Sequence, residues 1–178
     1  MLSLAAYYYA LKFNLTHGSI AKYSHERFSW RWVLLVGYME SGDLSSNLYK
    51  NANNVFGMRV PSSRKYYGSG SYDTGSNGLF AKYRSVWQCV RDWFEWLEYN
   101  SYHQQPGIRT FYGLVQFMQS KGYCANKTAQ EYYDLCVSHN AKVDKVPNPM
   151  IGLGAAFSIT ITLIVLNRKK IAQWIRRK

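Results

Sequence analysis

The hydrophobic side chains of residues 30–40 recur at the spacing of an α-helix and share one face. The residues on this face are Trp32, Leu35, Val36 and Met39. Ser29 precedes the run and is a candidate cap for its first turn. Gly42 follows the run and favours the left-handed conformation in which many helices end. The pattern therefore predicts a helix that ends close to residue 40.

Four further stretches have patterns or boundaries that are typical of helices. They are residues 1–13, 81–100, 109–121 and 128–138. Residues 61–80 are instead rich in Gly, Ser and Tyr, and they contain the turn signal Asn77-Gly78. This stretch predicts a β-hairpin or a flap, so the chain is expected to be mainly helical with a small β-lobe.

Residues 81–100 combine an apolar face with charged positions. The predicted core face consists of Val86, Val90, Leu97 and either Trp93 or Phe94. Ser85 is the candidate cap for this helix. The acidic residues of the stretch are interpreted as charges on its solvated face, and they are Asp92, Glu95 and Glu98.

The C-terminal part of the chain differs sharply in composition. After a Pro-Asn-Pro boundary at 147–149, residues 150–166 carry no charge and have about the minimum length that spans a bilayer. Basic residues follow at 168–170, which favours a cytoplasmic C-terminus and a domain on the opposite, extracytoplasmic side. We expect a domain at 1–146, followed by a linker, one transmembrane helix and a basic tail at 147–178. A buried core helix is the structural alternative.

Small residues at the start of this apolar segment would permit contacts between membrane helices, so self-association is a possible consequence. These residues are Gly152, Gly154, Ala155 and Ala156. The last eight residues are typical of an amphipathic segment that lies against lipid. The lipid bilayer is therefore an expected partner.

The chain is strongly basic, with 22 Lys and Arg against 10 Asp and Glu among 178 residues. Six of the basic residues lie after Leu166, which leaves 16 basic against 10 acidic residues before it. Such a surface attracts a polyanion, whether nucleic acid, anionic lipid or cell wall. The sequence contains no recognisable nucleic-acid-binding motif, so no nucleic-acid partner is expected. The 16 Tyr and six Trp residues suit stacking on sugar rings as well as core packing.

Metal and disulfide signals are weak. The three cysteines are an odd number, so a disulfide framework is not indicated, although Cys124 and Cys136 could pair in an oxidising compartment. Three buried thiols are an equal alternative. The four histidines are scattered and none has the spacing of a metal site. No metal and no cofactor are expected.

Glu40 is the polar residue at the predicted end of the first strongly periodic helix. The partial negative charge of a helix C-terminus and the preceding apolar run would both raise the pKa of its carboxyl group. A carboxylic acid that stays protonated near neutral pH is what a glycosidase uses to protonate a leaving oxygen. A solvated surface glutamate is the simpler reading of this position alone.

Two motifs around this residue resemble a known family. Glu40 begins a Glu-Ser-Gly segment, and an Asn-Asn-x-Phe-Gly segment follows at residues 53–57. In this order and spacing they resemble the bacterial and phage glucosaminidase family of peptidoglycan hydrolases, a branch of the lysozyme-like superfamily. The segment at 122–126 is similar to the family's Gly-Tyr-Ala-Thr-Asp turn, with Cys, Ala and Asn at its last three positions.

The resemblance implies an α+β, mainly α, lysozyme-like domain with a small β-lobe, here followed by one transmembrane helix. It implies hydrolysis of peptidoglycan glycan strands after N-acetylglucosamine, with Glu40 as the general acid. Asp73 is the candidate second acid, although an Asp beside Thr and Gly is equally an ordinary turn residue. The implied substrate-binding residues are Tyr123, Asn54 and Ser41. Phe56 is expected to pack in the core.

Two other functions remain open at this point. The domain could be a catalytically inactive wall-binding or structural membrane protein, for example a virion component, since the conventional second acid is missing. It could also be a lytic transglycosylase, which likewise uses one glutamate but yields an anhydro sugar. A single membrane anchor would suit either a bacterial wall-remodelling factor or a membrane-containing phage, and the sequence does not choose between them.

Overall fold

The computed structural model of this chain describes residues 1–17, 28–75, 79–105, 108 and 110–149. The chain divides into two compact units, Met1–Lys145 and Val146–Lys178, and the description below concerns the first. Its elements, in chain order, are α1 (Leu2–His17), α2 (Trp30–Glu40), α3 (Asn47–Ala52), β1 (Gly70–Asp73), β2 (Leu79–Lys82), α4 (Val86–Tyr99), the 3₁₀ helix η1 (Tyr102–Gln104), α5 (Phe111–Ser120), α6 (Ala129–Val137) and α7 (Asn140–Val143).

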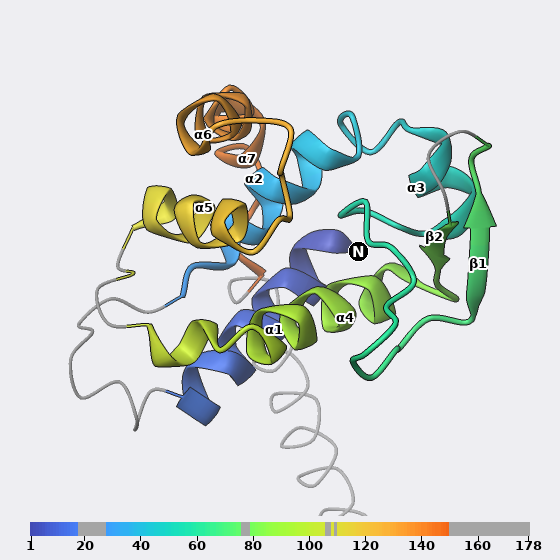
Figure 1. Ribbon diagram of the computed structural model, residues 1–178. Coiled ribbons are helices and arrows are strands. Elements are labelled where there is room, and N and C mark those ends of the chain that lie inside the picture. Colours follow the sequence, from blue (N-terminus) through green and yellow to red (C-terminus); the bar gives the residue numbers. More distant parts are fainter. Residues whose placement is uncertain (18–27, 76–78, 106–107, 109, 150–178) are drawn as a thin grey trace, which may run out of the picture. The chain divides into compact units, whose positions relative to one another are not determined.

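Helix α2 lies at the centre of this unit, with α5, α6 and α7 on one side and α3 with the two strands on the other (Figure 1). The Ser29 hydroxyl caps it by accepting from the amide of Arg31, as predicted. Its residues 33–37 are buried. A Cβ on Gly37 would meet Val55 at 3.0 Å and Leu2 at 3.1 Å, so this glycine lets two neighbouring segments approach the helix closely. The predicted central helix is confirmed.

Helices α1 and α4 pack against each other below α2 (Figure 1). The apolar face predicted for α4 is confirmed, and both Trp93 and Phe94 are buried with it. The predicted cap is confirmed too, because Ser85 accepts from the amide of Gln88. The Phe56 ring is 1 % exposed and stacks on Trp93 with ring centres 5.1 Å apart, so its predicted packing role is confirmed.

The small β-lobe is an antiparallel hairpin of β1 and β2, in which Gly70 pairs with Lys82 and Asp73 pairs with Leu79. The hairpin prediction for this region is confirmed, while the Asn77-Gly78 turn signal lies outside the described residues. Strand β2 also reaches the rest of the domain, since the Ala81 amide donates to the Met58 carbonyl at 2.8 Å. The observed fold is thus mainly helical with one small sheet.

The interpretation of Asp92 as a solvated charge is wrong. Its side chain is fully buried, and its two carboxylate oxygens accept from the two terminal nitrogens of Arg64 at 2.6 and 2.8 Å. The Tyr83 hydroxyl donates to the same carboxylate at 2.7 Å. Three polar groups from the loop after α3, from the end of the hairpin and from α4 therefore satisfy one another inside the protein.

Helices α5 and α6 correspond to the stretches predicted at 109–121 and 128–138, and both predictions are confirmed. Thr128 and Glu131 form a reciprocal capping box at the start of α6. The short helix α7 follows α6 and was not predicted. Helix α6 packs against both α5 and α2, which brings the C-terminal part of the domain to the end of the central helix.

Two expectations about the cysteines and the membrane can be compared with the described part of the chain. Cys89, Cys124 and Cys136 are all buried free thiols, so the alternative without a disulfide is the one observed. The predicted transmembrane helix at 150–166 lies outside the described residues. Among the helices that are described, none combines the length and the apolar character that crossing a bilayer requires.

Candidate active site

Glu40 is the last residue of α2, and its side chain is half-buried. Its Oε1 atom accepts a hydrogen bond of 2.6 Å from the hydroxyl of Tyr132, which lies on α6 and is 2 % exposed. The contact joins two residues that are 92 positions apart in the sequence. It fixes the orientation of the carboxyl group relative to the two packed helices.

Burial raises the pKa of the Glu40 carboxyl group above its usual value. The hydrogen bond from Tyr132 and the positive charge of Lys127 act in the opposite direction and lower this pKa, and burial outweighs both. The net shift has the direction that the sequence predicts, with desolvation as its largest cause. Glu40 is therefore a carboxyl group that holds its proton more tightly than a surface glutamate does.

The Asn-Asn-x-Phe-Gly turn lies against this carboxyl group. Gly57 has a φ of +61°, and a Cβ at this position would lie 3.2 Å from Oε2 of Glu40. A side chain here would thus be strained by the backbone conformation and would press on the carboxylate. Two features favour glycine at this position of the motif, namely the left-handed backbone conformation and the close approach to Glu40.

Asn54 holds this turn in place. Its side-chain amide donates to the carbonyls of Met58 and Ala81 at 2.8 Å each, and its Oδ1 accepts from the Met58 amide at 2.9 Å. The side chain is 1 % exposed. These contacts are all with backbone groups, so they give Asn54 a role in positioning the turn, and its predicted contact with substrate stays a prediction.

Ser41, whose contact with substrate stays a prediction, is fully buried and stabilises the end of α2. Its hydroxyl donates to the Gly37 carbonyl at 2.5 Å and accepts from the Leu44 amide at 2.9 Å. The next three residues, 42–44, all have positive φ angles, which is costly for the two that are not glycine. The hydroxyl of Ser41 spans this left-handed turn and so stabilises the point at which Glu40 leaves the helix.

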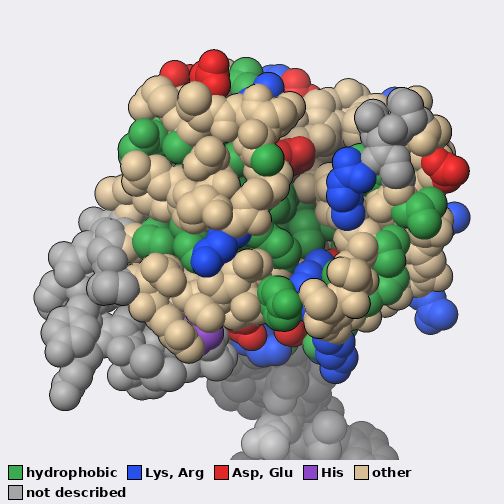
Figure 2. Space-filling view, in the orientation of Figure 1, with side chains coloured by type: hydrophobic (Ala, Val, Ile, Leu, Met, Phe, Trp, Pro, Cys, Tyr) green, Lys and Arg blue, Asp and Glu red, His purple; other side chains and the backbone are tan. Residues whose placement is uncertain are grey.

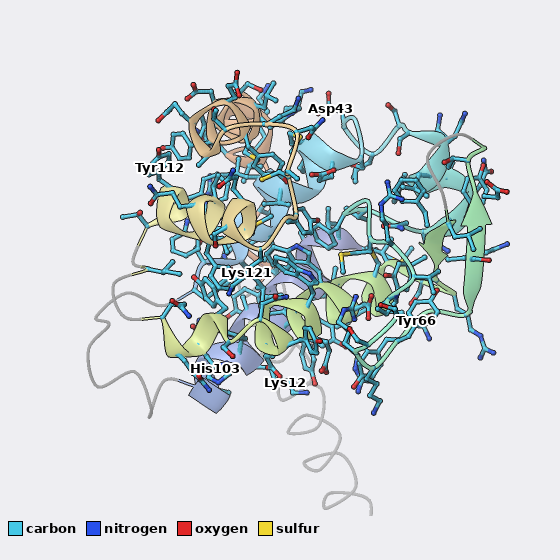
Figure 3. All side chains as sticks on the ribbon, in the orientation of Figure 1. Lys12, Asp43, Tyr66, His103, Tyr112 and Lys121 are labelled. Carbon is cyan, nitrogen blue, oxygen red and sulfur yellow. The ribbon has the colours of Figure 1, made fainter. Side chains whose placement is uncertain are left out.

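Asp43 anchors the same turn to the C-terminal helices. Its carboxylate accepts from Nδ1 of His139 at 2.9 Å and pairs with the ammonium group of Lys142. The hydrogen bond from Lys142 lowers the pKa of the Asp43 carboxyl group. Figure 3 shows Asp43 at the end of α2 close to α6. The turn that follows Glu40 is therefore held from inside by Ser41 and from outside by Asp43.

Tyr123 also contacts this turn, from the segment between α5 and α6. Its hydroxyl donates to the Phe56 carbonyl at 2.6 Å, and its ring packs on Trp96 with ring centres 5.0 Å apart. Burial raises the pKa of Tyr123 well above its usual value, and the nearby charge of Glu40 adds to this. The structure thus brings Tyr123 and Glu40 together at one peptide unit.

Asp73 is not part of this group. It is the last residue of β1, it is exposed, and its Oδ1 accepts from the amide of Gly75 at 2.7 Å. This is the ordinary turn chemistry that the sequence offered as the alternative reading. Within the described residues, no hydrogen bond or ion pair connects Asp73 to Glu40.

A hollow crosses the face that contains the end of α2 (Figure 2). Its floor is hydrophobic, an acidic side chain is exposed at one end, and basic side chains stand at its edges. Figure 3 places Lys121 on the α5 side of this face and Tyr66 on the side of the hairpin. The face that contains the end of α2 thus combines a hollow with an apolar floor and charged side chains at its edges, an arrangement that suits a carbohydrate chain.

Sequence reasoning missed three residues of this arrangement. Tyr132, Lys127 and Gly57 all act directly on the Glu40 carboxyl group, yet none was a predicted site residue. Tyr132 and Cys136 are the buried pair of α6 at a spacing of four, so their inward orientation could have been read from the sequence. The hydrogen-bond partner of Tyr132 could not have been read from the sequence, because it belongs to another helix.

In the described part of the chain, no group of three or more His, Cys, Asp or Glu side chains could hold a metal ion.

Comparison with known proteins places this site in context. Residues 20–145 match a protein family described as Glucosaminidase, mannosyl-glycoprotein endo-beta-N-acetylglucosaminidase. A search of curated proteins gives no match. Among solved structures, a type VI secretion system effector–immunity complex from Pseudomonas protegens is similar with a TM-score of 0.49 and 14 % identity, covering 80 % of this chain and 94 % of that chain.

The family match spans the central helix, the Asn-Asn-x-Phe-Gly turn, the hairpin and the helices α4 to α7. It therefore includes Tyr132, Gly57 and Lys127, which act on the Glu40 carboxyl group. The match also agrees with the motifs at 40–42 and 53–57, which point to the same family. The chain belongs to the glucosaminidase family, and it is a glycosidase that acts on peptidoglycan.

Proposed function

We propose that this glycosidase cleaves the peptidoglycan glycan strand internally, at the bond that follows N-acetylglucosamine, with Glu40 as the general acid. The observation that carries the proposal is the state of the Glu40 carboxyl group. It is half-buried, it is bonded to Tyr132, and its pKa is raised by burial. A carboxyl group in this state can donate a proton to the glycosidic oxygen as the bond breaks.

The contacts of the carboxyl group suggest which oxygen carries the proton. Because the Tyr132 hydroxyl donates to Oε1, the proton of the neutral acid belongs on Oε2. Oε2 is the oxygen that lies next to Gly57, a residue without a side chain. We infer that the leaving oxygen of the sugar approaches Oε2 across this glycine.

A second catalytic group, which would assist Glu40, could come from Asp73 or from the substrate itself. In its exposed position on a turn, Asp73 would reach the substrate only if the hairpin approached the groove. Assistance by the acetamido group of the substrate would remove the need for a second protein carboxylate near Glu40. In this proposal Tyr123 lines the groove and holds the Phe56 carbonyl, and its high pKa keeps its hydroxyl neutral.

Replacing Tyr132 with phenylalanine should move the alkaline limb of the pH–activity profile to higher pH. The general acid must be protonated, so activity is present below the pKa of Glu40 and is lost as the pH rises through it. The Tyr132 hydrogen bond lowers that pKa, and its removal therefore raises it. The pH dependence of kcat/KM on solubilised glycan tests this, with Tyr133→Phe as the neighbouring control. A limb that moves to lower pH would contradict the assigned role of Glu40.

Mass analysis of the muropeptides released from sacculi tests the proposal as a whole. A hydrolase of the proposed type releases fragments with N-acetylglucosamine at the reducing end. A lytic transglycosylase, which would also use Glu40, releases anhydro sugars instead. Binding to sacculi without any release would favour the inactive wall-binding or virion protein, for which the exposed position of Asp73 is the one supporting observation.

Membrane attachment is a second part of the proposal. The uncharged residues 150–166 and the basic residues 168–170 support a single-pass anchor with the catalytic domain on the extracytoplasmic side. Protease treatment of intact cells or virions, followed by detection of the C-terminal tail, would test both the anchor and its direction. A chain that is released by salt alone would contradict the anchor.

A further inference from the structure

The positive charge of the region before residue 167 is concentrated in one part of the chain. Residues 44–91 contain seven Lys and Arg but only one acidic residue, Asp73. The rest of residues 1–166 contains nine basic and nine acidic residues. The segment that carries this net charge comprises α3, the loop after it, the β-hairpin and the first turns of α4. We call residues 44–91 the basic lobe.

Two of the seven cations of the basic lobe are already paired within the protein. Arg64 is bonded to the buried carboxylate of Asp92, and Arg91 lies 3.9 Å from Glu95. The acidic group of Asp73 is turned onto the amide of Gly75. None of the ion pairs described for residues 1–149 includes Asp73.

Four basic side chains of the lobe are exposed and take part in no ion pair among the described residues: Lys50, Lys65, Lys82 and Arg84. Several charges of one sign on one part of a surface create a positive potential that attracts anionic ligands. Figure 2 shows Lys and Arg side chains around the part of the face that carries the hairpin, including the edge of the hollow.

The basic lobe is connected to Glu40 by short contacts. Strand β2 is tied to the Asn-Asn-x-Phe-Gly turn through the bond from Asn54 to the Ala81 carbonyl, and the Tyr83 amide donates to the Ala52 carbonyl at 2.9 Å. The same turn places Gly57 against Glu40. A polymer bound at Glu40 and longer than the groove would thus extend past the lobe.

We propose that the basic lobe binds the carboxylates of the peptide stems that project from the glycan strand, so that the enzyme prefers strands that carry free, negatively charged stems. This inference rests on the proposed function, because it takes peptidoglycan as the polymer in the groove. The stems recur along that polymer and carry carboxylates, whereas the sugar rings next to Glu40 are largely uncharged. Exposed cations recognise such groups through several weak contacts that salt screens.

A binding experiment with the full-length chain tests the lobe separately from catalysis. All proteins carry Glu40→Gln, so that the polymer is not consumed. Lys82→Gln with Arg84→Gln removes two charges from the lobe, and Lys12→Gln with Lys145→Gln removes two exposed charges elsewhere. Lys12 lies away from the hairpin (Figure 3). Each protein is sedimented with intact sacculi, with glycan from which an amidase has removed the stems, and with sacculi whose phosphodiester polymers have been extracted by acid.

The lobe pair should weaken binding to intact sacculi by about threefold to tenfold at low salt, and the difference should vanish at high salt. It should bind stem-free glycan as the control pair does, and acid extraction should leave the difference unchanged. An equal loss on stem-free glycan, an equal loss in the control pair, or a difference that disappears after acid extraction would each overturn the proposal. If Glu40 proves not to be the catalytic acid, the proposed function fails while this binding result still stands.

Discussion

Replacing Glu40 with glutamine should lower the rate of glycan hydrolysis by at least about 100-fold, the usual contribution of a general acid. Glutamine keeps the shape of the side chain and can still accept from the Tyr132 hydroxyl, but it has no acidic proton to give. The loss should therefore appear in kcat more than in KM. The release of reducing ends from purified sacculi measures it.

The same variant should be at least as stable as the parent at neutral pH. Because burial raises the pKa of Glu40 in the folded protein, ionisation of this group costs stability as the pH rises from the unfolded value through the folded one. Glutamine removes that cost, so thermal unfolding at pH 7 should occur no earlier. Glu95→Gln, on the surface of α4, serves as the matched control for losing one carboxylate. A Glu40→Gln protein that is folded and fully active would refute the role proposed for Glu40.

The second large effect should come from Asp92. Changing it to leucine leaves the buried Arg64 guanidinium without its counter-ion, with only the Lys65 carbonyl as acceptor, since Arg64 is 6 % and Asp92 0 % exposed. Breaking a buried ion pair in this way typically costs about 3–5 kcal/mol of unfolding free energy. For a chain of this size, the melting temperature should fall by roughly 10 °C. Urea unfolding followed by circular dichroism provides the free energy.

A double variant separates the lost pair from a simple packing defect. Arg64→Met combined with Asp92→Leu replaces both charges with apolar groups of similar size, which is often neutral for stability. The double variant should therefore recover much of the stability that Asp92→Leu loses. If it is less stable than Asp92→Leu alone, the uncompensated charge of Arg64 is not the cause. The Tyr83 hydroxyl also loses its acceptor in Asp92→Leu, so Tyr83 would then be the next residue to substitute.

The helices could be predicted because their signals are local. Ser29, Ser85 and Thr128 each cap the helix that follows them, and a cap depends on only three or four consecutive residues. The apolar spacing within α2 and α4 is equally local. The hairpin followed from turn-forming residues between two short strands.

The interpretation of Asp92 failed for a physical reason. A charged residue beside an apolar stripe usually faces water, and the spacing along α4 cannot reveal a counter-ion that lies 28 residues earlier. Ser41 and Asn54 bind backbone groups in the structure, as short polar side chains readily do, and their predicted contacts with substrate stay predictions. In each case the partner of the polar group decided its role.

By itself, the sequence determined the helical elements, the family and the position of the candidate acid, because motifs and periodicity are properties of neighbouring residues. Only the tertiary structure decided what surrounds that acid. Tyr132 reaches Glu40 across 92 positions, Gly57 faces its second oxygen, and Asp73 stays on its own turn. The pKa of a carboxyl group depends on burial and on nearby charges, and both arise only when distant segments pack together.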